Sequence, residues 1–268
     1  MPYSNYYQKS KLLHGSMTSI MGTRLDAVML GDELQLSEVW ERIIDETERL
    51  HRMLNHFDSE SDIARINREA SNYPVVLNDE LWNIMTDVKN YYQKTFGYFD
   101  VSLRDFNRVI FDDDRRSVKF AEKNISLDFG GYAKGYALQQ IQEILFNNDV
   151  AQALVNFGNS SILAVGAHPH GQYWGIDIDN TFDPGQHLQT CKLYNKSLSV
   201  SGNTSKHKQH IVNPRSGKYS AERKIVSVIS TSPVEAEVLS TAIMVADENT
   251  ILSIKRIFEN VIIYIFAV

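Results

Sequence analysis

A single cysteine and the lack of any long apolar run limit what this 268-residue chain can be. Cys191 has no second cysteine to pair with, which excludes an intramolecular disulfide and a cysteine zinc site. No apolar stretch reaches the roughly 18 to 20 residues that a membrane-spanning helix needs. Residues 1–15 also lack the charged start and apolar core of a secretory leader. We therefore expect either a cytoplasmic protein or a secreted one whose leader has been removed.

Basic residues are not in excess either. The 27 lysines and arginines are outnumbered by 33 aspartates and glutamates, which gives a formal net charge of −6 at pH 7. Charges of both signs are mixed along the chain, so the sequence offers no basic face for a phosphate backbone. We expect no nucleic-acid partner, and the sequence leaves the oligomeric state unknown.

The composition is that of a folded enzyme. Hydrophobic residues make up 43% of the chain, enough to bury a substantial core. The hydrophobic period switches repeatedly between two and about 3.6, with no low-complexity linker or internal repeat. This pattern predicts interleaved strands and helices, and we expect one α+β domain over residues 1–268.

Local signals place the individual elements. Ser37, Asn78 and Ser232 are predicted N-caps, and Gly97 suits the left-handed position after a helix. We expect helices at 37–57, 79–97, 133–145, 233–245 and 249–258, and strands at 24–30, 125–128, 153–157, 162–165, 173–179, 193–200, 224–230 and 261–268.

A glycine-rich turn with a lysine lies at an expected junction of strand and helix, in residues 126–137 (SLDFGGYAKGYA). Glycines allow close backbone approach, and a helix N-terminus attracts an anion through its N–H groups and dipole. Lys134 would add a positive charge, so the pattern suits a phosphate group. The alternative is an ordinary tight turn followed by a solvated lysine.

A possible cation site lies on the helix that Ser232 begins. Glu237 and Thr241 are four residues apart and therefore share one helix face, with Ser240 beside them. A carboxylate and a hydroxyl, joined by a loop carbonyl, would suit Mg²⁺, which prefers oxygen ligands. The alternative is a solvated glutamate on an amphipathic helix.

The remaining polar candidates are less specific. His210 precedes a short apolar run that ends in a proline, and it is either a general base or a hydrogen-bonded structural residue. His207 is expected at the surface. Asp100 and Asp62 lie at expected helix boundaries, and for each of them contact with a ligand and a structural role are both open. At the second boundary the structural role is that of a helix cap, filled by either Ser61 or Asp62.

Taken in order, these motifs resemble those of the FAD:protein FMN transferase family, also called ApbE flavin transferases. The resemblance covers most of the chain and is clearest in the glycine-rich turn. Its blocks are Met21–Thr23, Phe57–Asn67, Gly97–Asp100, Leu127–Tyr136, Ala153–Gly158, Ser201–Gly202, His210–Gly217 and Glu237–Ala242.

The resemblance implies a fold, a reaction and a compartment. The fold would be α+β, ApbE-like and T-fold-like, with a mixed, largely antiparallel sheet core packed with helices and FAD in a cleft between two lobes. The enzyme would use Mg²⁺ to transfer FMN from FAD to a Thr or Ser hydroxyl of an acceptor flavoprotein, releasing AMP. The family also implies a periplasmic or cell-envelope location.

Residue roles follow by matching the motifs. His210 would be the catalytic base that deprotonates the acceptor hydroxyl. The Mg²⁺ ligands would be the carbonyl of Ala133 with Glu237 and Thr241. The residues implied in FAD binding are Met21, Phe57, Asp100, Gly131, Ala133, Lys134, Ser201, Gly202, His210 and Ile211.

Some positions depart from the family's pattern. Glu237 stands where the family usually has Asp, and Gly158–Ser160 replaces a usual Gly-Gly-Asp. Gln139 and the pair Val101–Ser102 also differ from the usual residues. These changes fall in the expected cofactor site. They leave open two alternatives: an FAD-binding relative with weak or lost transferase activity, and an FAD pyrophosphatase in which water replaces the acceptor hydroxyl.

Overall fold

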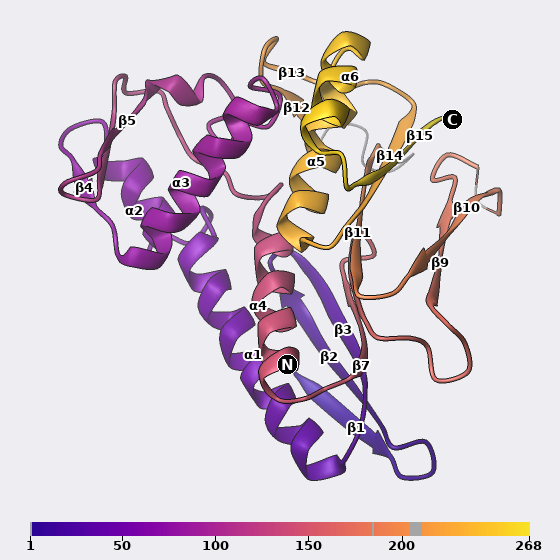
Figure 1. The fold of residues 1–268 in the computed structure, drawn as a ribbon. Coiled ribbons are helices and arrows are strands. Elements are labelled where there is room, and N and C mark those ends of the chain that lie inside the picture. The colour runs from indigo at the N-terminus through magenta and orange to yellow at the C-terminus, as the bar shows by residue number, and fades with distance from the viewer. Residues whose placement is uncertain (1, 184, 204–210) are drawn as a thin grey trace.

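The computed structural model describes residues 2–183, 185–203 and 211–268. Its centre is an eight-stranded sheet in the order β1-β2-β3-β7-β8-β11-β14-β15 (Figure 1). Every neighbouring pair in this sheet is antiparallel, as expected for a largely antiparallel core. The strands are β1 (Tyr3–Tyr7), β2 (Leu12–Ile20), β3 (Thr23–Leu30), β7 (Gln152–Phe157), β8 (Ser161–Val165), β11 (Lys196–Gly202), β14 (Lys224–Ser230) and β15 (Ile262–Ala267).

Six helices and three small sheets complete the described part of the chain. The helices are α1 (Glu33–Leu54), α2 (Asp62–Glu69), α3 (Asp79–Lys94), α4 (Ala133–Asn147), α5 (Pro233–Val245) and α6 (Glu248–Ile257), with a short 3-10 helix at Phe106–Arg108. The small sheets are β4 (Val75–Val76) with β6 (Ser117–Phe120) and β5 (Val109–Asp112), β9 (Trp174–Asp179) with β10 (His187–Leu193), and β12 (Val212–Asn213) with β13 (Lys218–Tyr219). No helix in the described ranges is long and apolar enough to span a membrane.

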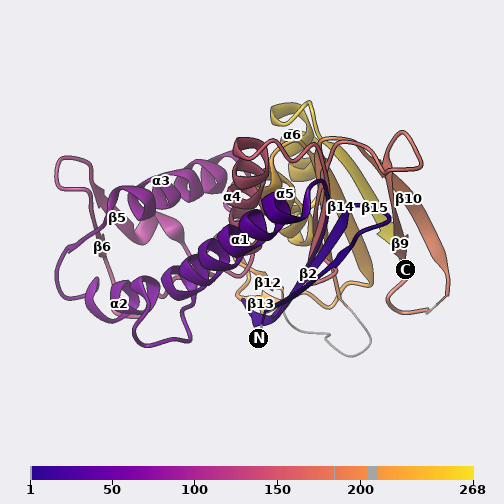
Figure 2. The same cartoon turned by 90° about the horizontal axis from the view of Figure 1, so that it is seen from below.

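Helices α1, α4 and α5 cover one face of the large sheet (Figures 1 and 2). Strand β7 alternates between half-buried and fully buried residues, because only its core-facing side meets these helices. The helices approach closely at glycines. A Cβ on Gly15 would lie 2.5 Å from the Trp40 ring of α1, and a Cβ on Gly135 would lie 2.8 Å from the Glu237 Cβ of α5. These glycines let the helices pack near the backbone of their neighbours.

The β9–β10 hairpin packs against the other face of the sheet. Trp174, Cys191 and Leu193 of the hairpin form a second apolar cluster with Leu198 of β11 and Ile229 of β14. Because both faces are covered there, β8 and β14 are almost continuously buried rather than alternating.

Helices α2 and α3 form a second lobe with the three-stranded β4-β6-β5 sheet, beside α1 and away from the large sheet (Figure 1). Helix α3 begins at the expected residue but ends at Lys94, before the predicted stop at Gly97. The Asn78 side chain accepts a hydrogen bond from the Leu81 N–H at 2.8 Å, and Gly97 takes a φ of 76° as its N–H donates to the Tyr92 carbonyl. After α3, residues 98–103 lead to the 3-10 helix and to β5 and β6 of the same lobe, and the chain enters α4 only at Ala133.

Other expected elements and boundaries also differ from the structure. Helix α1 begins at Glu33 rather than near Ser37, because the Asp32 side chain accepts from the N–H groups of Leu34 and Gln35. Residues 125–128 form no strand: the Asp128 N–H donates to the Val101 carbonyl in an isolated contact. The run 193–200 is divided by a turn between β10 and β11, where Asn195 has a φ of 48°. Strands β1 and β2 were not expected, because β1 is polar and Tyr-rich and the apolar residues of β2 do not alternate regularly.

Candidate functional site

A pocket of about 610 Å³ lies where the segment from the second lobe meets the large sheet and the start of α4. The expected cleft between two lobes is therefore present. The glycine-rich turn and α5 form adjoining parts of its wall, although about 100 residues separate them in sequence. This main pocket is lined by Tyr98–Val101, Leu103, Asp128, Gly130, Gly131, Lys134, Gly158–Ser160, Thr181, Val200–Gly202, Ile211, Val212, Pro214, Ile225, Glu237 and Thr241.

The turn before α4 brings the helix N-terminus to this pocket without a side-chain cap. The Gly130 N–H donates to the Asp128 side chain at 2.8 Å, which fixes the turn. Tyr132 precedes the helix without a side-chain capping bond, so no side chain of its own covers the first-turn N–H groups. A Cβ on Gly131 would lie 3.3 Å from the Thr241 side chain. The glycine thus keeps α5 and the turn close, and the helix start suits an anion.

The charged centre of the pocket is an ion pair between Lys134 and Glu237. The Lys134 Nζ contacts the Glu237 Oε1, and the two side chains are only 17% and 5% exposed. Two serines from the sheet hold the other oxygen: Ser161 of β8 and Ser199 of β11 both donate to Oε2, the latter at 3.0 Å. Glu237 is therefore a buried carboxylate with its charge balanced and its hydrogen bonds satisfied. The alternative of a solvated glutamate does not hold.

A chain of hydroxyls continues from Glu237 to the pocket wall. Ser199 contacts Ser240 at 2.9 Å, and Ser240 contacts Ser201 at 2.8 Å. The ionised carboxylate can only accept, so the single hydrogen of Ser199 goes to it. The Ser240 hydroxyl donates to the Glu237 backbone carbonyl at 3.0 Å, so Ser240 is left as the acceptor and Ser201 as the donor in their contact. Ser201 consequently presents lone pairs to the pocket and accepts from whatever N–H or O–H lies there.

The oxygen atoms around Glu237 suit a hard divalent cation. The Glu237 carboxylate and the Thr241 hydroxyl, whose Oγ1 donates to the Glu237 carbonyl at 3.0 Å, both line the main pocket. Within the described ranges, no three His, Cys, Asp or Glu residues are grouped to hold a metal. A Mg²⁺ ion here would therefore depend on hydroxyl, carbonyl and water oxygens beside one carboxylate, which Mg²⁺ accepts. These oxygen atoms therefore fit a Mg²⁺ ion. In this structure the cation in contact with the Glu237 carboxylate is the ammonium of Lys134.

Asp100 and Tyr98 form another part of the pocket wall. Burial raises the pKa of Asp100, although its carboxylate accepts from the N–H and hydroxyl of Ser102 at 2.7 and 2.6 Å and from the Phe106 N–H at 3.2 Å. These bonds show a structural role for Asp100 as well as its position on the pocket. The Tyr98 hydroxyl donates to Asp247 at 2.5 Å and the Arg215 guanidinium lies over its ring at 4.3 Å. Tyr98 is thus held from both sides.

The structure brings together most of the predicted binding residues. Asp100, Gly131, Lys134 and Ile211 line the main pocket, as do Ser201 and Gly202. Met21 and Ala133 line a smaller adjoining pocket of about 180 Å³, which shares Gly130, Lys134, Gly158 and Ser160 with the main one.

Two predicted residues are not placed in either pocket. Phe57 is 87% exposed and packs its ring on His56 at 3.8 Å; it remains a prediction as an FAD contact. His210 lies outside the described residues, as does His207, so the role of His210 also remains a prediction. The expected cap Ser61 accepts from the Ala64 N–H at 3.0 Å and so fixes the start of α2.

Sequence reasoning missed Ser161 and Ser199. Both lie in buried runs of their strands, so a serine there is out of solvent and needs a polar partner. That conflict was the only available signal, and it does not name Glu237 as the partner. Tyr98 was also missed, because its restraints come from Arg215 and Asp247, far along the chain.

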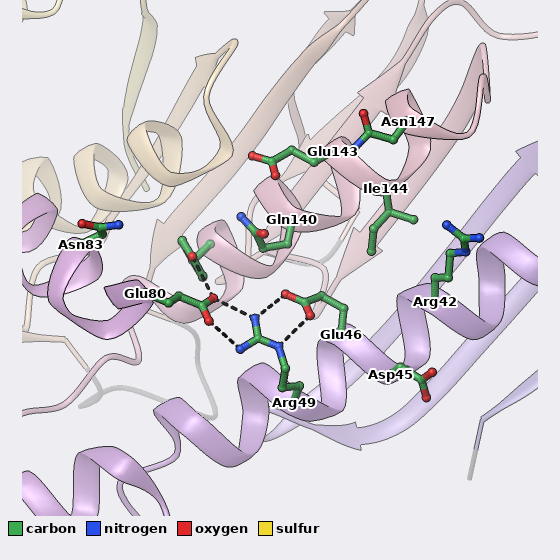
Figure 3. Close-up of a pocket in the computed structure, with 11 residues that line it drawn as sticks. Arg42, Asp45, Glu46, Arg49, Glu80, Asn83, Gln140, Glu143, Ile144 and Asn147 are labelled. Carbon is green, nitrogen blue, oxygen red and sulfur yellow. Dashed lines mark hydrogen bonds and ion pairs between the residues drawn. The ribbon is translucent and has the colours of Figure 1, made fainter. Parts of the chain in front are cut away.

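A larger and more open groove of about 790 Å³ lies elsewhere, between α1, α3 and α4 (Figure 3). At its centre Arg49 is held by Glu46 at 2.7 and 2.8 Å and by Glu80 at 2.6 and 2.8 Å, and the Tyr136 hydroxyl donates to Glu80 at 3.0 Å. The charges are thereby paired with one another. Tyr136 belongs to α4, so this network fixes the helix that carries Lys134, and we assign it a structural role.

The whole fold matches crystal structures of ApbE proteins. The ApbE protein of Thermotoga maritima aligns with a TM-score of 0.82 and 19% identity, covering 99% of this chain and 94% of that one. The apo form of the Pseudomonas stutzeri flavinyl transferase ApbE aligns with a TM-score of 0.80 and 21% identity, covering 92% and 88%. The architecture is that of ApbE proteins.

Sequence comparison places the chain in a family. The family model described as ApbE family matches residues 21–111 and 102–265, and the chain belongs to this family. A Chlamydia muridarum protein named FAD:protein FMN transferase is 23% identical over 273 residues, which is 85% of this chain and 84% of that protein. A Klebsiella pneumoniae protein of the same name is 29% identical over 143 residues, half of this chain and 43% of the relative.

Proposed function

We propose that this protein is an FAD:protein FMN transferase, which moves the FMN part of FAD to a hydroxyl of an acceptor protein. The single observation that carries the proposal is the placement of Lys134 and Glu237 at the N-terminus of α4, inside a pocket of about 610 Å³. That volume is in the usual range of ligand sites. The relatives that carry this name support the same reaction.

The two parts of the main pocket suit the two parts of a flavin dinucleotide. Leu103, Val200, Ile211, Pro214 and Ile225 give an apolar wall for a flat ring system. The open start of α4 and the ammonium of Lys134 give a cationic wall for a diphosphate. FAD is therefore proposed to bind with its diphosphate at the glycine-rich turn.

The proposed reaction is a phosphoryl transfer. The oxygen of an acceptor Thr or Ser hydroxyl forms a bond to the phosphorus of the FMN half, the bond from this phosphorus to the bridging oxygen breaks, and AMP leaves. The hydroxyl proton goes to a base, for which the family motif indicates His210. Lys134 offsets negative charge on the diphosphate, and the main contributions of the protein are positioning and charge stabilisation.

Mg²⁺ is proposed to be held by Glu237, Thr241 and the Ala133 carbonyl, where it would neutralise diphosphate charge. Glu237 reaches its position from α5 with Ser161 and Ser199 donating to one oxygen, so the carboxylate is already oriented.

Incubation with FAD, Mg²⁺ and a flavoprotein domain with a Thr or Ser flavinylation site tests the proposal. We expect flavin fluorescence on the acceptor that survives denaturing electrophoresis, with AMP released in equal amount. Omission of the acceptor is the key control. AMP and FMN appearing at the same rate without it would show a pyrophosphatase instead, and FAD binding without AMP would show a binding protein.

A further inference from the structure

The ammonium group of Lys134 contacts the carboxylate of Glu237, which is a proposed ligand of the divalent cation. Its Nζ contacts the Oε1 of Glu237, and both side chains lie largely out of solvent. Ser161 and Ser199 both donate to the other oxygen, Oε2. Oε1 is therefore the oxygen left to receive a cation, and it already has one. An ammonium and a divalent ion that both contacted Oε1 would lie close together and largely out of solvent, where they repel each other strongly. They therefore cannot share this oxygen.

Lys134 also lines the pocket beside the place proposed for the diphosphate. It belongs to the first turn of α4, next to Gly130 and Gly131, and contributes to both the main and the smaller pocket. Its long, flexible side chain can exchange one anionic partner for another, whereas Glu237 is fixed by two serines. A diphosphate at the turn is such a second partner.

From these contacts we propose that Lys134 couples the binding of FAD and of the divalent cation. Without FAD, the ammonium blocks Oε1 of Glu237. When the diphosphate of FAD binds at the glycine-rich turn, Lys134 moves to it and leaves Oε1, with the hydroxyl of Thr241, to the cation. The two ligands therefore bind with positive coupling. This inference rests on the proposed function for the identity of the diphosphate ligand.

The coupling must be reciprocal. If FAD raises the affinity for the cation by some factor, the cation raises the affinity for FAD by the same factor. Couplings of this kind are typically about 5- to 150-fold. A Lys134→Met substitution removes the competing charge, so cation binding without FAD becomes stronger and the effect of FAD on it becomes smaller than in the unaltered protein.

Binding of Mn²⁺, used as a paramagnetic probe, measures this directly by electron paramagnetic resonance of the free ion. For the unaltered protein we expect weak Mn²⁺ binding alone and about 5- to 150-fold tighter binding with saturating FAD. For Lys134→Met we expect Mn²⁺ alone to bind at least about fivefold more tightly than to the unaltered protein. Lys123→Met, which removes an exposed lysine away from the site, should change neither value.

Unchanged or weaker Mn²⁺ binding to Lys134→Met, in protein shown to be folded by circular dichroism, would overturn the proposal. Lys134→Gln serves as a second variant if methionine destabilises the fold, because its neutral amide can still donate to Glu237. Glu237→Gln should abolish the tight Mn²⁺ binding of the Lys134 variants. The Mn²⁺ measurements without FAD test the competition between Lys134 and the cation at Oε1, whatever the diphosphate ligand is. If FAD does not bind, the proposed function fails, but this competition is still tested.

Discussion

Lys134 and Glu237 form an ion pair although 103 positions separate them in the chain. Helices α4 and α5 bring them together, because Gly135 allows the two helices to approach and Ser232 fixes where α5 begins. The pair lies on the wall of the main pocket and supplies its central charges. The proposed binding site depends on this junction between α4 and α5.

The close approach at Gly135 gives the first prediction. In Gly135→Ala, the added Cβ would lie 2.8 Å from the Glu237 Cβ and 2.9 Å from the Pro233 carbonyl oxygen. We expect a loss of about 1–3 kcal/mol in the free energy of unfolding, measured by urea denaturation, because both neighbours are backbone or helix-bound atoms. Gly171→Ala is the matched control, since its nearest neighbour is 3.7 Å away. Equal stability of the two variants would contradict close packing of α4 on α5.

Lys134 gives the second prediction. Lys134→Ala removes the positive charge beside the proposed diphosphate site, so FAD should bind more weakly. Hydrogen bonds to charged groups contribute about 1.5–3 kcal/mol, which corresponds to roughly 10- to 150-fold in the dissociation constant. Quenching of flavin fluorescence measures this, with Lys123→Ala as the control. An unaltered dissociation constant would remove Lys134 from the site.

The third prediction concerns the base. His210→Ala should lower the rate of FMN transfer by about 10²–10⁴-fold, the usual contribution of general acid–base catalysis, while FAD binding changes little. The rate is measured from AMP release in the presence of acceptor. His207→Ala, three positions earlier, is the control and should retain full transfer. Unchanged transfer in His210→Ala would exclude this histidine as the base.

The Arg49 network gives the fourth prediction, which concerns stability rather than binding. Arg49 forms paired hydrogen bonds with both Glu46 and Glu80, whereas Arg52 contacts Glu48 at 3.8 Å from a more exposed position. Arg49→Met should lower the free energy of unfolding by about 1 kcal/mol, a value reduced for solvent screening. Arg52→Met should change it by less than about 0.5 kcal/mol. A larger effect at Arg52 would contradict the structural role assigned to the groove.

The fifth prediction concerns acid stability. The hydrogen bond from Tyr98 lowers the pKa of Asp247 from 3.8 to about 2. A lowered folded-state pKa means that the unfolded chain binds more protons, so this contribution is present above pH 3.8 and is lost as pH falls toward 2. Asp247→Asn should therefore flatten the fall of urea midpoints between pH 4 and 2. Asp114→Asn, an exposed aspartate in a turn, should leave the slope unchanged.

Much of the fold followed from local sequence signals. The caps at Asn78 and Ser232 placed the starts of α3 and α5 correctly, because a cap acts within one helical turn. The prediction of a strand at residues 125–128 was wrong, because a short apolar run does not show whether a partner strand exists. Asp32 was overlooked in favour of Ser37, since both residue types cap helices well.

The site was predictable only in part. The glycine-rich turn and Glu237 were identified as separate motifs, but their ion pair was not, since sequence spacing says nothing about contacts between two helices. Ser161 and Ser199 lie on strands far from either motif, and their common acceptor is visible only in three dimensions. The motifs therefore predicted many of the residues that line the pocket, whereas their hydrogen-bond and ion-pair partners are visible only in the folded structure.

The most direct test of the central claim is covalent flavin on an acceptor protein. With FAD, Mg²⁺ and the acceptor present, mass spectrometry should show one FMN group attached to a single Thr or Ser, with AMP formed in equal amount. Glu237→Ala should lose this product. Acceptor that stays unmodified while FAD is bound in the pocket, or FMN and AMP that form only by hydrolysis, would contradict the account.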